Sequence, residues 1–201
     1  MREIVADIWT WPWFSARHGY NFNGFFMCHA AGNLCIDPVE PDPDTLAEIG
    51  RLGVARVILT NRNHVRAANV VRARTGARTA IHPDDAGYAR GQGAEVDDEL
   101  RHGEPIGPFI TIGVPGKSPG EVALHWPERR ILIVGDAVIG TPAGRCSLLS
   151  EKVIDNPVRL RASVAGLLDL DFDTLLVGDG ESILHGTKDR VAELVASFLG
   201  A

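Results

Sequence analysis

The chain has 201 residues, of which 45% are hydrophobic and 23% are charged, and its formal net charge is −6. This composition is typical of a single globular domain with a substantial core, and we treat residues 1–201 as one domain. The absence of a basic run argues against a nucleic-acid partner, and no apolar run is long enough to span a bilayer. The N-terminus also lacks the apolar region of a signal peptide, so we expect a cytoplasmic protein.

The first half of the chain alternates strand-like and helix-like segments. In chain order the predicted elements are strands at 4–9, 22–29 and 33–36, a helix at 43–52, a strand at 54–59, a helix at 65–75 and a strand at 79–81. Asp42 or Asp44 is placed to cap the first helix. Cys28 and Cys35 would face each other if residues 25–29 and 34–37 pair as a hairpin, and two thiols rather than a disulfide are expected in a reducing compartment.

The second half contains consecutive strands separated by Gly/Pro turns, followed by helices. The predicted elements are strands at 104–106, 109–114, 121–126 and 130–134, a helix at 157–168, a strand at 174–177 and a terminal helix that starts at Thr187. Asn156 and Pro157 form an N-cap and a first helical position for the helix at 157–168. Two groups of strands, each followed by helices, predict an α+β fold in which two packed sheets are flanked by helices, a four-layer αββα sandwich.

Four loops that follow apolar strands carry more polar residues than their surroundings. They are residues 60–66, residues 115–120, Gly135-Asp136 and Gly178-Asp179-Gly180. Loops at the carboxyl ends of strands are where α/β architectures usually place their ligands. The alternative for each aspartate is that it caps a turn or a helix.

The order and spacing of these loops resemble those of the metallo-β-lactamase-fold hydrolases along nearly the whole chain. The matching landmarks are Asn23-Gly24, Ile36-Asp37-Pro38, Leu59-Thr60, Pro115 to Gly120, Val134-Gly135-Asp136 and Val177-Gly178-Asp179-Gly180. The resemblance implies the αββα sandwich, with an active site at one edge.

The resemblance also implies that most of the family's metal ligands are replaced here. The family's Thr-His-x-His-x-Asp-His loop places its first two histidines on Asn61 and Asn63, and its final Asp-His pair on Val65 and Arg66. The histidine of its Pro-Gly-His turn falls on Lys117, its bridging aspartate on Asp136 and its last histidine on Asp179. Asparagine oxygen is a poor zinc ligand, and a protonated amine has no lone pair to donate.

We therefore predict that the protein has no dinuclear zinc centre and no cofactor. Instead, the Lys117 ammonium is expected to pair with Asp136 and Asp179 and to offset their mutual repulsion. Two arrangements with a single divalent cation remain open. One uses His64 with Asp136 and Asp179, and the other uses Asn63 with the same two aspartates.

The function implied by the resemblance is hydrolysis of a small ester, lactone or thioester at a diverged site. Asp136 or Asp179 would act as the general base, with Lys117 as the contact for the oxyanion or for a carboxylate. The predicted substrate-binding residues are Asn61, Asn63, His64 and Arg66. The alternative is a pseudoenzyme that binds a small anion in the former metal pocket, so the question of whether this is an enzyme stays open.

A cluster of aromatic residues near the N-terminus adds a further candidate surface. Residues 9–14 contain three of the four tryptophans. Such a cluster either walls a pocket for a small molecule or forms a homodimer contact, and packing of a hairpin explains it equally well.

Overall fold

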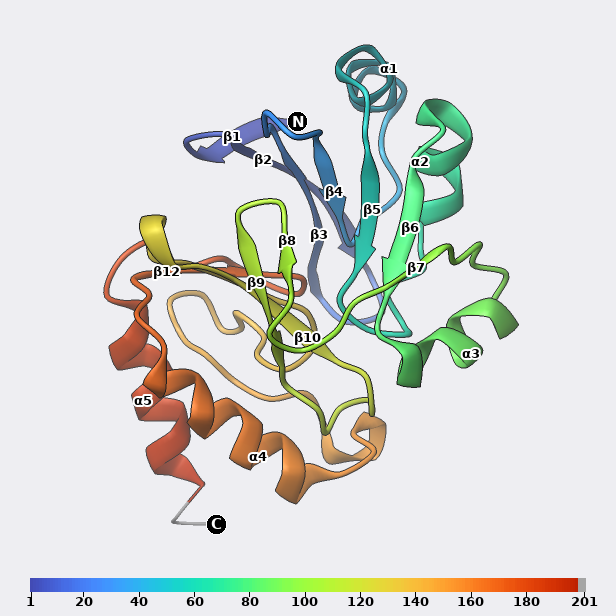
Figure 1. The fold of residues 1–201 in the computed structure, drawn as a ribbon. Coiled ribbons are helices and arrows are strands. Elements are labelled where there is room, and N and C mark those ends of the chain that lie inside the picture. The colour runs from blue at the N-terminus through green and yellow to red at the C-terminus, as the bar shows by residue number, and fades with distance from the viewer. Residues whose placement is uncertain (199–201) are drawn as a thin grey trace. The chain divides into compact units, whose positions relative to one another are not determined.

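The computed structural model describes residues 1–198, and its strands fall into two sheets with helices beside them (Figure 1). This confirms the predicted combination of two sheets and helices. The described part of the chain forms two compact units, residues 1–100 and residues 101–198. The expectation of one domain over residues 1–201 stays a prediction.

The first unit contains a seven-stranded sheet whose strands follow one another in sequence order. The strands are β1 (Arg2–Val5), β2 (Ile8–Ser15), β3 (Tyr20–Met27), β4 (Leu34–Ile36), β5 (Arg56–Leu59), β6 (Arg78–Ile81) and β7 (Asp98–Glu99). Strands β1 to β4 pair antiparallel, and β4 to β7 pair parallel. Asp7, with a positive φ of 65°, lies in the turn between β1 and β2, and residues 9–14 with their aromatic side chains lie in β2.

Three helices of the first unit cover one face of this sheet. They are α1 (Pro43–Leu52), α2 (Ala68–Thr75) and α3 (Pro83–Gly91). Ile49 of α1, Val71 of α2 and Ala89 of α3 share one buried cluster with Val57 and Leu59 of β5. Of the two predicted caps for α1 it is Asp42 that serves, since its carboxylate accepts a hydrogen bond from Thr45 N at 2.8 Å.

The predicted facing of Cys28 and Cys35 is wrong. The register of β3 and β4 pairs Cys35 with Phe26, so Cys28 lies beyond the paired residues. Cys28, Cys35 and Cys146 are all free thiols in the described structure. Burial, followed by the charge of Asp37, raises the pKa of the Cys35 thiol far above its ordinary value.

The second unit contains a five-stranded sheet in the order β12-β11-β10-β9-β8. Its strands are β8 (Pro105–Ile106), β9 (Phe109–Gly113), β10 (Val122–Trp126), β11 (Ile131–Val134) and β12 (Thr174–Val177). Its helices are α4 (Pro157–Gly166) and α5 (Thr187–Ser197), with short 3₁₀ turns η1 (Pro127–Arg129), η2 (Glu151–Val153) and η3 (Leu167–Asp169). Leu160 and Val164 of α4 and Val191 of α5 pack with Leu132 and Leu175 in one core.

The pairing of β11 with β12 positions the candidate site residues that follow these two strands. The two strands are parallel and end together, with Val134 opposite Val177. All residues of both strands are buried, as is typical of parallel strands in a core. The residues that follow Val134 and Val177 therefore emerge side by side at one edge of the sheet.

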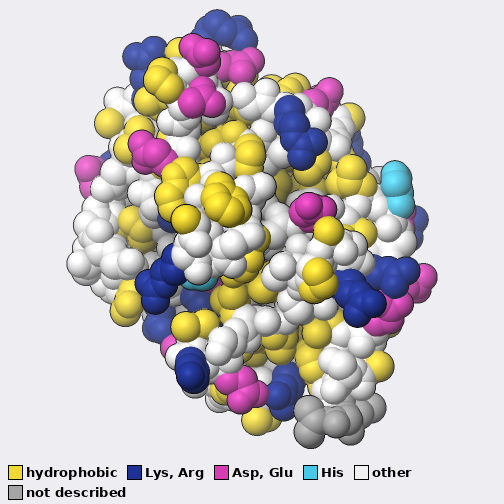
Figure 2. Space-filling view, turned by 180° about the vertical axis from the view of Figure 1, so that it is seen from behind, with side chains coloured by type: hydrophobic (Ala, Val, Ile, Leu, Met, Phe, Trp, Pro, Cys, Tyr) yellow, Lys and Arg dark blue, Asp and Glu magenta, His cyan; other side chains and the backbone are white. Residues whose placement is uncertain are grey.

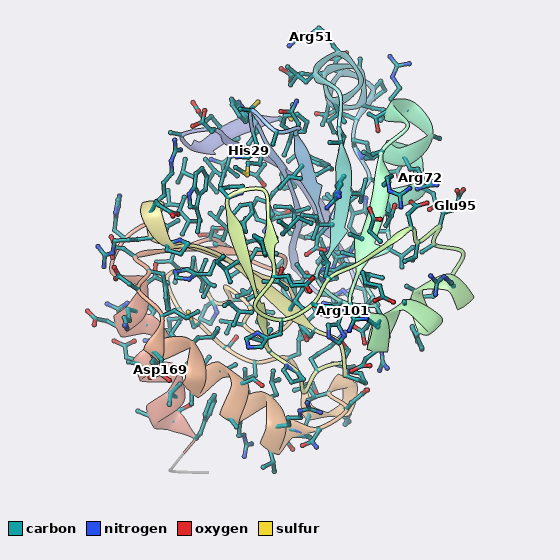
Figure 3. All side chains as sticks on the ribbon, viewed as in Figure 1. His29, Arg51, Arg72, Glu95, Arg101 and Asp169 are labelled. Atoms are coloured by element: carbon teal, nitrogen blue, oxygen red, sulfur yellow. The ribbon has the colours of Figure 1, made fainter. Side chains whose placement is uncertain are left out.

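No helix among residues 1–198 has the length and apolar character needed to cross a bilayer. On the face drawn in Figure 2, basic and acidic side chains are interspersed with apolar ones. Arg72 of α2 forms one such surface ion pair with Glu95, with 2.9 Å between Nε and Oε2 (Figure 3).

Candidate functional site

The loop at residues 60–66 of the first unit is closed by one buried carboxylate. Asp37, which follows β4, accepts hydrogen bonds from Thr60 N at 2.8 Å and from Thr60 Oγ1 at 2.6 Å. The same carboxylate lies 2.9 Å from His64 Nδ1, and the side chains of His64 and Asp37 are 0% and 1% exposed. An imidazole that bonds to a carboxylate through Nδ1 carries its lone pair on Nε2, which is the tautomer suited to act as a base or a ligand.

Asn61 and Asn63 differ in their surroundings. Asn61 is fully buried, and its Oδ1 accepts a hydrogen bond from Asn63 N at 2.8 Å. This is an asparagine turn, in which the side chain shapes its own loop. Asn63 is exposed. Their roles in substrate binding stay predictions, but the structure already gives Asn61 a part in forming the loop.

Arg66 lies at a pocket of the first unit. The pocket has a volume of about 450 Å³ and is lined by Trp13, Phe22, Val39, Glu40, Arg66 and Ala67. The Arg66 guanidinium stacks over the Phe22 ring with 4.2 Å to its centroid, and Trp13 stacks on Phe22 at 5.8 Å. The pocket therefore combines an aromatic wall with one basic and one acidic side chain, Arg66 and Glu40, and its size suits a small planar molecule.

In the second unit Lys117 and Asp136 form a buried ion pair. Lys117 Nζ lies 2.6 Å from Asp136 Oδ2, and each side chain is 6% exposed. The predicted pairing of Lys117 with Asp136 is thus observed, whereas its pairing with Asp179 stays a prediction. The backbone N–H of Asp136 donates to Glu121 Oε1 at 2.6 Å, so a second buried acid fixes the segment that carries Asp136.

The parallel pairing of β11 with β12 also brings Asp179 close to Asp136. Asp136 and Asp179 are each two residues beyond a pair of directly opposed residues, Val134 and Val177. Each aspartate is 4% exposed, and their carboxylates offer oxygens within 4.8 Å of one another. The second unit therefore gathers two carboxylates and one ammonium at the carboxyl ends of β11 and β12.

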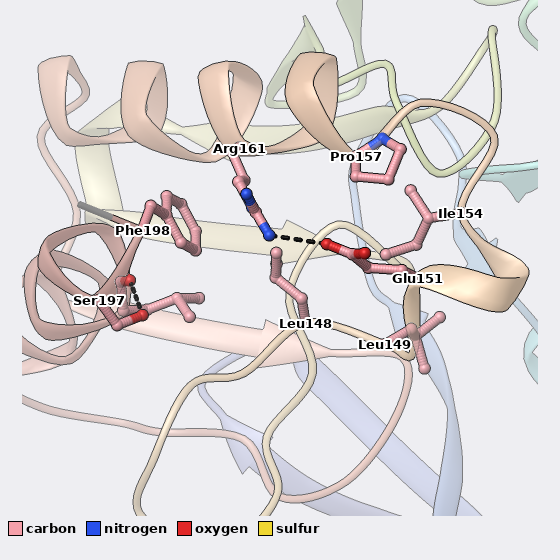
Figure 4. Close-up of a pocket in the computed structure, with 9 residues that line it drawn as sticks. Leu148, Leu149, Glu151, Ile154, Pro157, Arg161, Ser197 and Phe198 are labelled. Atoms are coloured by element: carbon pink, nitrogen blue, oxygen red, sulfur yellow. Dashed lines mark hydrogen bonds and ion pairs between the residues drawn. The ribbon is translucent and has the colours of Figure 1, made fainter. Parts of the chain in front are cut away.

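Another pocket of the second unit contains none of the predicted site residues. It has a volume of about 270 Å³ and is lined by Leu148, Leu149, Glu151, Ile154, Pro157, Arg161, Leu194, Ser197 and Phe198 (Figure 4). Arg161 and Glu151 form an ion pair of 2.7 Å at its rim. Six of its nine lining residues are apolar, and its acid, Glu151, is paired with Arg161.

Comparison with known proteins decides the family. The sequence model of the metallo-β-lactamase superfamily matches residues 2–198. The chain belongs to this superfamily. The resemblance predicted from the loops is confirmed, and so is the fold that it implied.

The similar proteins include enzymes and metal-bound structures. Hydroxyacylglutathione hydrolase from Fuscovulum blasticum is 28% identical over 175 residues, which cover 82% of this chain and 64% of that protein. The chain thus spans less than two thirds of this relative. A metallo-β-lactamase from Pseudomonas aeruginosa, solved in a mono-zinc form, has a TM-score of 0.77 at 14% identity and covers 98% of this chain and 94% of that one. A protein solved in a di-iron-bound form has a TM-score of 0.69 at 24% identity and covers 90% and 98%.

These relatives contradict the prediction that the protein uses no cofactor. Two of the solved structures were captured with iron or zinc. The prediction is wrong because the family's histidine positions are not the only source of metal ligands, and carboxylate oxygens remain at the site. Asp136 and Asp179, with carboxylate oxygens within 4.8 Å, fit a single divalent cation bound through oxygen. In this family member Lys117 adds an ammonium at the same carboxylate, a group that cannot itself be a ligand.

Sequence reasoning missed two acids that hold the site together. Asp37 directly follows the predicted strand at 33–36, and Glu121 begins the one at 121–126. Both signals were present, since each is an acid next to an apolar strand, but each acts on residues at least 15 positions away. Such hydrogen-bond partners are brought together by the tertiary fold, so no local sequence spacing predicts them.

Proposed function

We propose that the protein is a hydrolase of a small ester, lactone or thioester. The observation that carries the proposal is the buried arrangement of Lys117, Asp136 and Asp179 at the ends of β11 and β12. Membership in a superfamily with hydrolases supports it. The curated relative named hydroxyacylglutathione hydrolase favours a thioester among the three substrate classes.

The two carboxylates and the ammonium have different roles in the proposed hydrolysis. Asp136 or Asp179 accepts a proton from water, whose oxygen then attacks the carbonyl carbon of the substrate. Lys117 supplies positive charge to the carbonyl oxygen as it becomes an oxyanion. The carbon–sulfur or carbon–oxygen bond then breaks, and the proton passes to the leaving thiolate or alkoxide. A divalent cation held by Asp136 and Asp179, in the place that the Lys117 ammonium takes beside Asp136, would acidify the water and polarise the carbonyl.

The test is turnover of one compound from each class, measured on purified protein supplied with zinc, manganese or iron. Suitable probes are a hydroxyacylglutathione, p-nitrophenyl acetate and an aliphatic lactone. We expect hydrolysis of at least one, and a fall of about 100-fold or more in kcat/KM for Asp136→Asn, since the substitution removes a base and a ligand. Asp169→Asn is the matched control, because Asp169 is an exposed aspartate of the same unit. Absence of turnover for all three classes, or an Asp136→Asn variant as active as the control, would exclude the proposal.

A second candidate function is binding without turnover, and the pocket beside Arg66 favours it. Its aromatic wall and the Arg66 guanidinium suit a small aromatic carboxylate that pairs with Arg66, while Glu40 adds one negative charge to the lining. Trp13 is 44% exposed, so its fluorescence should respond when a ligand enters. Saturable quenching by small aromatic carboxylates that is lost in Arg66→Met, together with no hydrolysis, would favour this candidate over the enzyme.

A further inference from the structure

The carboxylates of Asp136 and Asp179 place two negative charges close together inside the second unit, and a nearby positive charge would stabilise them. Each residue is 4% exposed, and the two groups offer oxygens within 4.8 Å of one another. Two negative charges this close and this poorly solvated repel each other strongly. The Lys117 ammonium, 2.6 Å from Asp136 Oδ2, supplies one positive charge and leaves the trio with a net charge of about −1 when all three are ionised.

The backbone that delivers Lys117 is held tightly. Gly116 has a φ of 144°, and a Cβ at this position would lie 2.3 Å from Leu160 N at the start of α4. Gly116 O accepts a hydrogen bond from Asn156 N at 2.8 Å, and Pro115 O accepts one from Ser163 Oγ at 2.7 Å. The turn is therefore anchored to α4 and its N-cap, and the flexible four-carbon stem of Lys117 is the part that can move.

We infer that the Lys117 ammonium competes with a divalent cation for Asp136, so that binding of the cation displaces Lys117. A divalent cation bound by Asp136 and Asp179 would bring two further positive charges up to the Lys117 ammonium, beside the two aspartates and the buried Glu121 carboxylate. Because the ammonium is only 2.6 Å from Asp136 Oδ2, it occupies the position that a cation on this oxygen must take. The two occupants therefore exclude each other by volume, and their like charges repel. Lys117 thus acts as a tethered competitor that lowers the affinity of the site for metal.

The inference does not depend on the hydrolase activity proposed above, and its readouts are binding and stability. Chelator-treated protein is titrated with Mn²⁺ and with Zn²⁺ by calorimetry, and Tm is followed in parallel. Lys117→Met removes the charge and keeps most of the stem. We expect it to bind Mn²⁺ at least about tenfold more tightly than the unaltered chain, and to gain more in Tm at saturating metal.

Two matched variants separate competition from a general charge effect. Lys152→Met removes the same charge from an exposed lysine of the same unit, and its Mn²⁺ affinity should equal that of the unaltered chain. Lys117→Met combined with Asp136→Asn should lose the gain. Equal affinity in Lys117→Met and the unaltered chain, or an equal gain in Lys152→Met, would overturn the inference.

A measurement on the unaltered chain covers the case in which Lys117→Met does not fold. The lysine side chains are labelled with ¹⁵N, and their ammonium signals are followed by NMR during a Zn²⁺ titration. The Lys117 signal should shift or vanish with the same midpoint as metal binding, while the Lys152 signal stays in place. Metal bound at one equivalent with an unchanged Lys117 signal would contradict displacement, as would failure of the site to bind either metal.

Discussion

His64 Nδ1 lies 2.9 Å from Asp37 Oδ2, and this fully buried pair joins the end of β4 to the loop that follows β5. Asp37 accepts two further hydrogen bonds from Thr60, so three donors converge on one carboxylate. Asp37 also has a positive φ of 47°, a conformation that aspartate and asparagine tolerate better than most residues. The loop therefore depends on both the charge and the backbone of a single residue.

Asp37→Asn should lower the free energy of unfolding by about 2–4 kcal/mol, as measured by urea denaturation at pH 7. Asparagine tolerates the backbone conformation, but its amide has one acceptor oxygen where the carboxylate has two. At least one of the three donors would then face an NH₂ group in a buried site. Asp84→Asn, at an exposed position of the same unit, is the control and should change stability by less than about 0.5 kcal/mol. A similar stability for the two variants would show that the Asp37 carboxylate does not hold the loop.

The contrast between α1 and α3 shows how far local patterns reach. The bounds of α1 were predicted correctly, because Asp42 as cap, Pro43 at the first position and an apolar stripe ending at Leu52 all agree. Helix α3 was missed. It is built from small and polar residues, and only Ala86 and Ala89 of its apolar side chains are buried, so it has no helical stripe to detect.

Some features of the candidate site could likewise be predicted from local sequence, and others could not. The positions of Asp136 and Asp179 could be predicted because each follows an uninterrupted apolar strand, and the parallel pairing of β11 with β12 brings them together. The pairing of Lys117 with Asp136 was predicted because the resemblance places both at ligand positions of the family's metal site and their charges are opposite. The anchoring of Asp136 N by Glu121 could not be predicted, because it depends on how the ends of β10 and β11 meet in three dimensions.

Gly116→Ala should destabilise the protein much more than a glycine substitution in open space. A Cβ at residue 116 would meet the backbone of Leu160 at 2.3 Å, and a φ of 144° is unfavourable for any residue with a side chain. We expect a loss of more than about 3 kcal/mol from strain and steric overlap combined. Gly144→Ala is the matched control in the same unit, since Gly144 has a φ of 74° and nothing within 4 Å of a Cβ, and it should cost only about 1 kcal/mol. Equal losses in urea denaturation would mean that the turn is not packed against α4 as described.

Asp97 should make the stability of the first unit depend on pH in the acidic range. Its hydrogen-bonded ion pair with Arg72, helped by a hydrogen bond from Thr79 N, lowers the pKa of Asp97 below its ordinary value of 3.8. A lowered pKa in the folded state means that this stabilisation is fully present above the pKa of the unfolded chain. It is lost as the pH falls from about 4 through the lower folded value. Asp97→Asn cannot ionise, so its stability deficit relative to the unaltered chain should be largest at pH 7 and should shrink below pH 4. Urea denaturation at steps between pH 7 and pH 3 measures the deficit directly. A deficit that stays constant over this range would show that the charge of Asp97 contributes nothing.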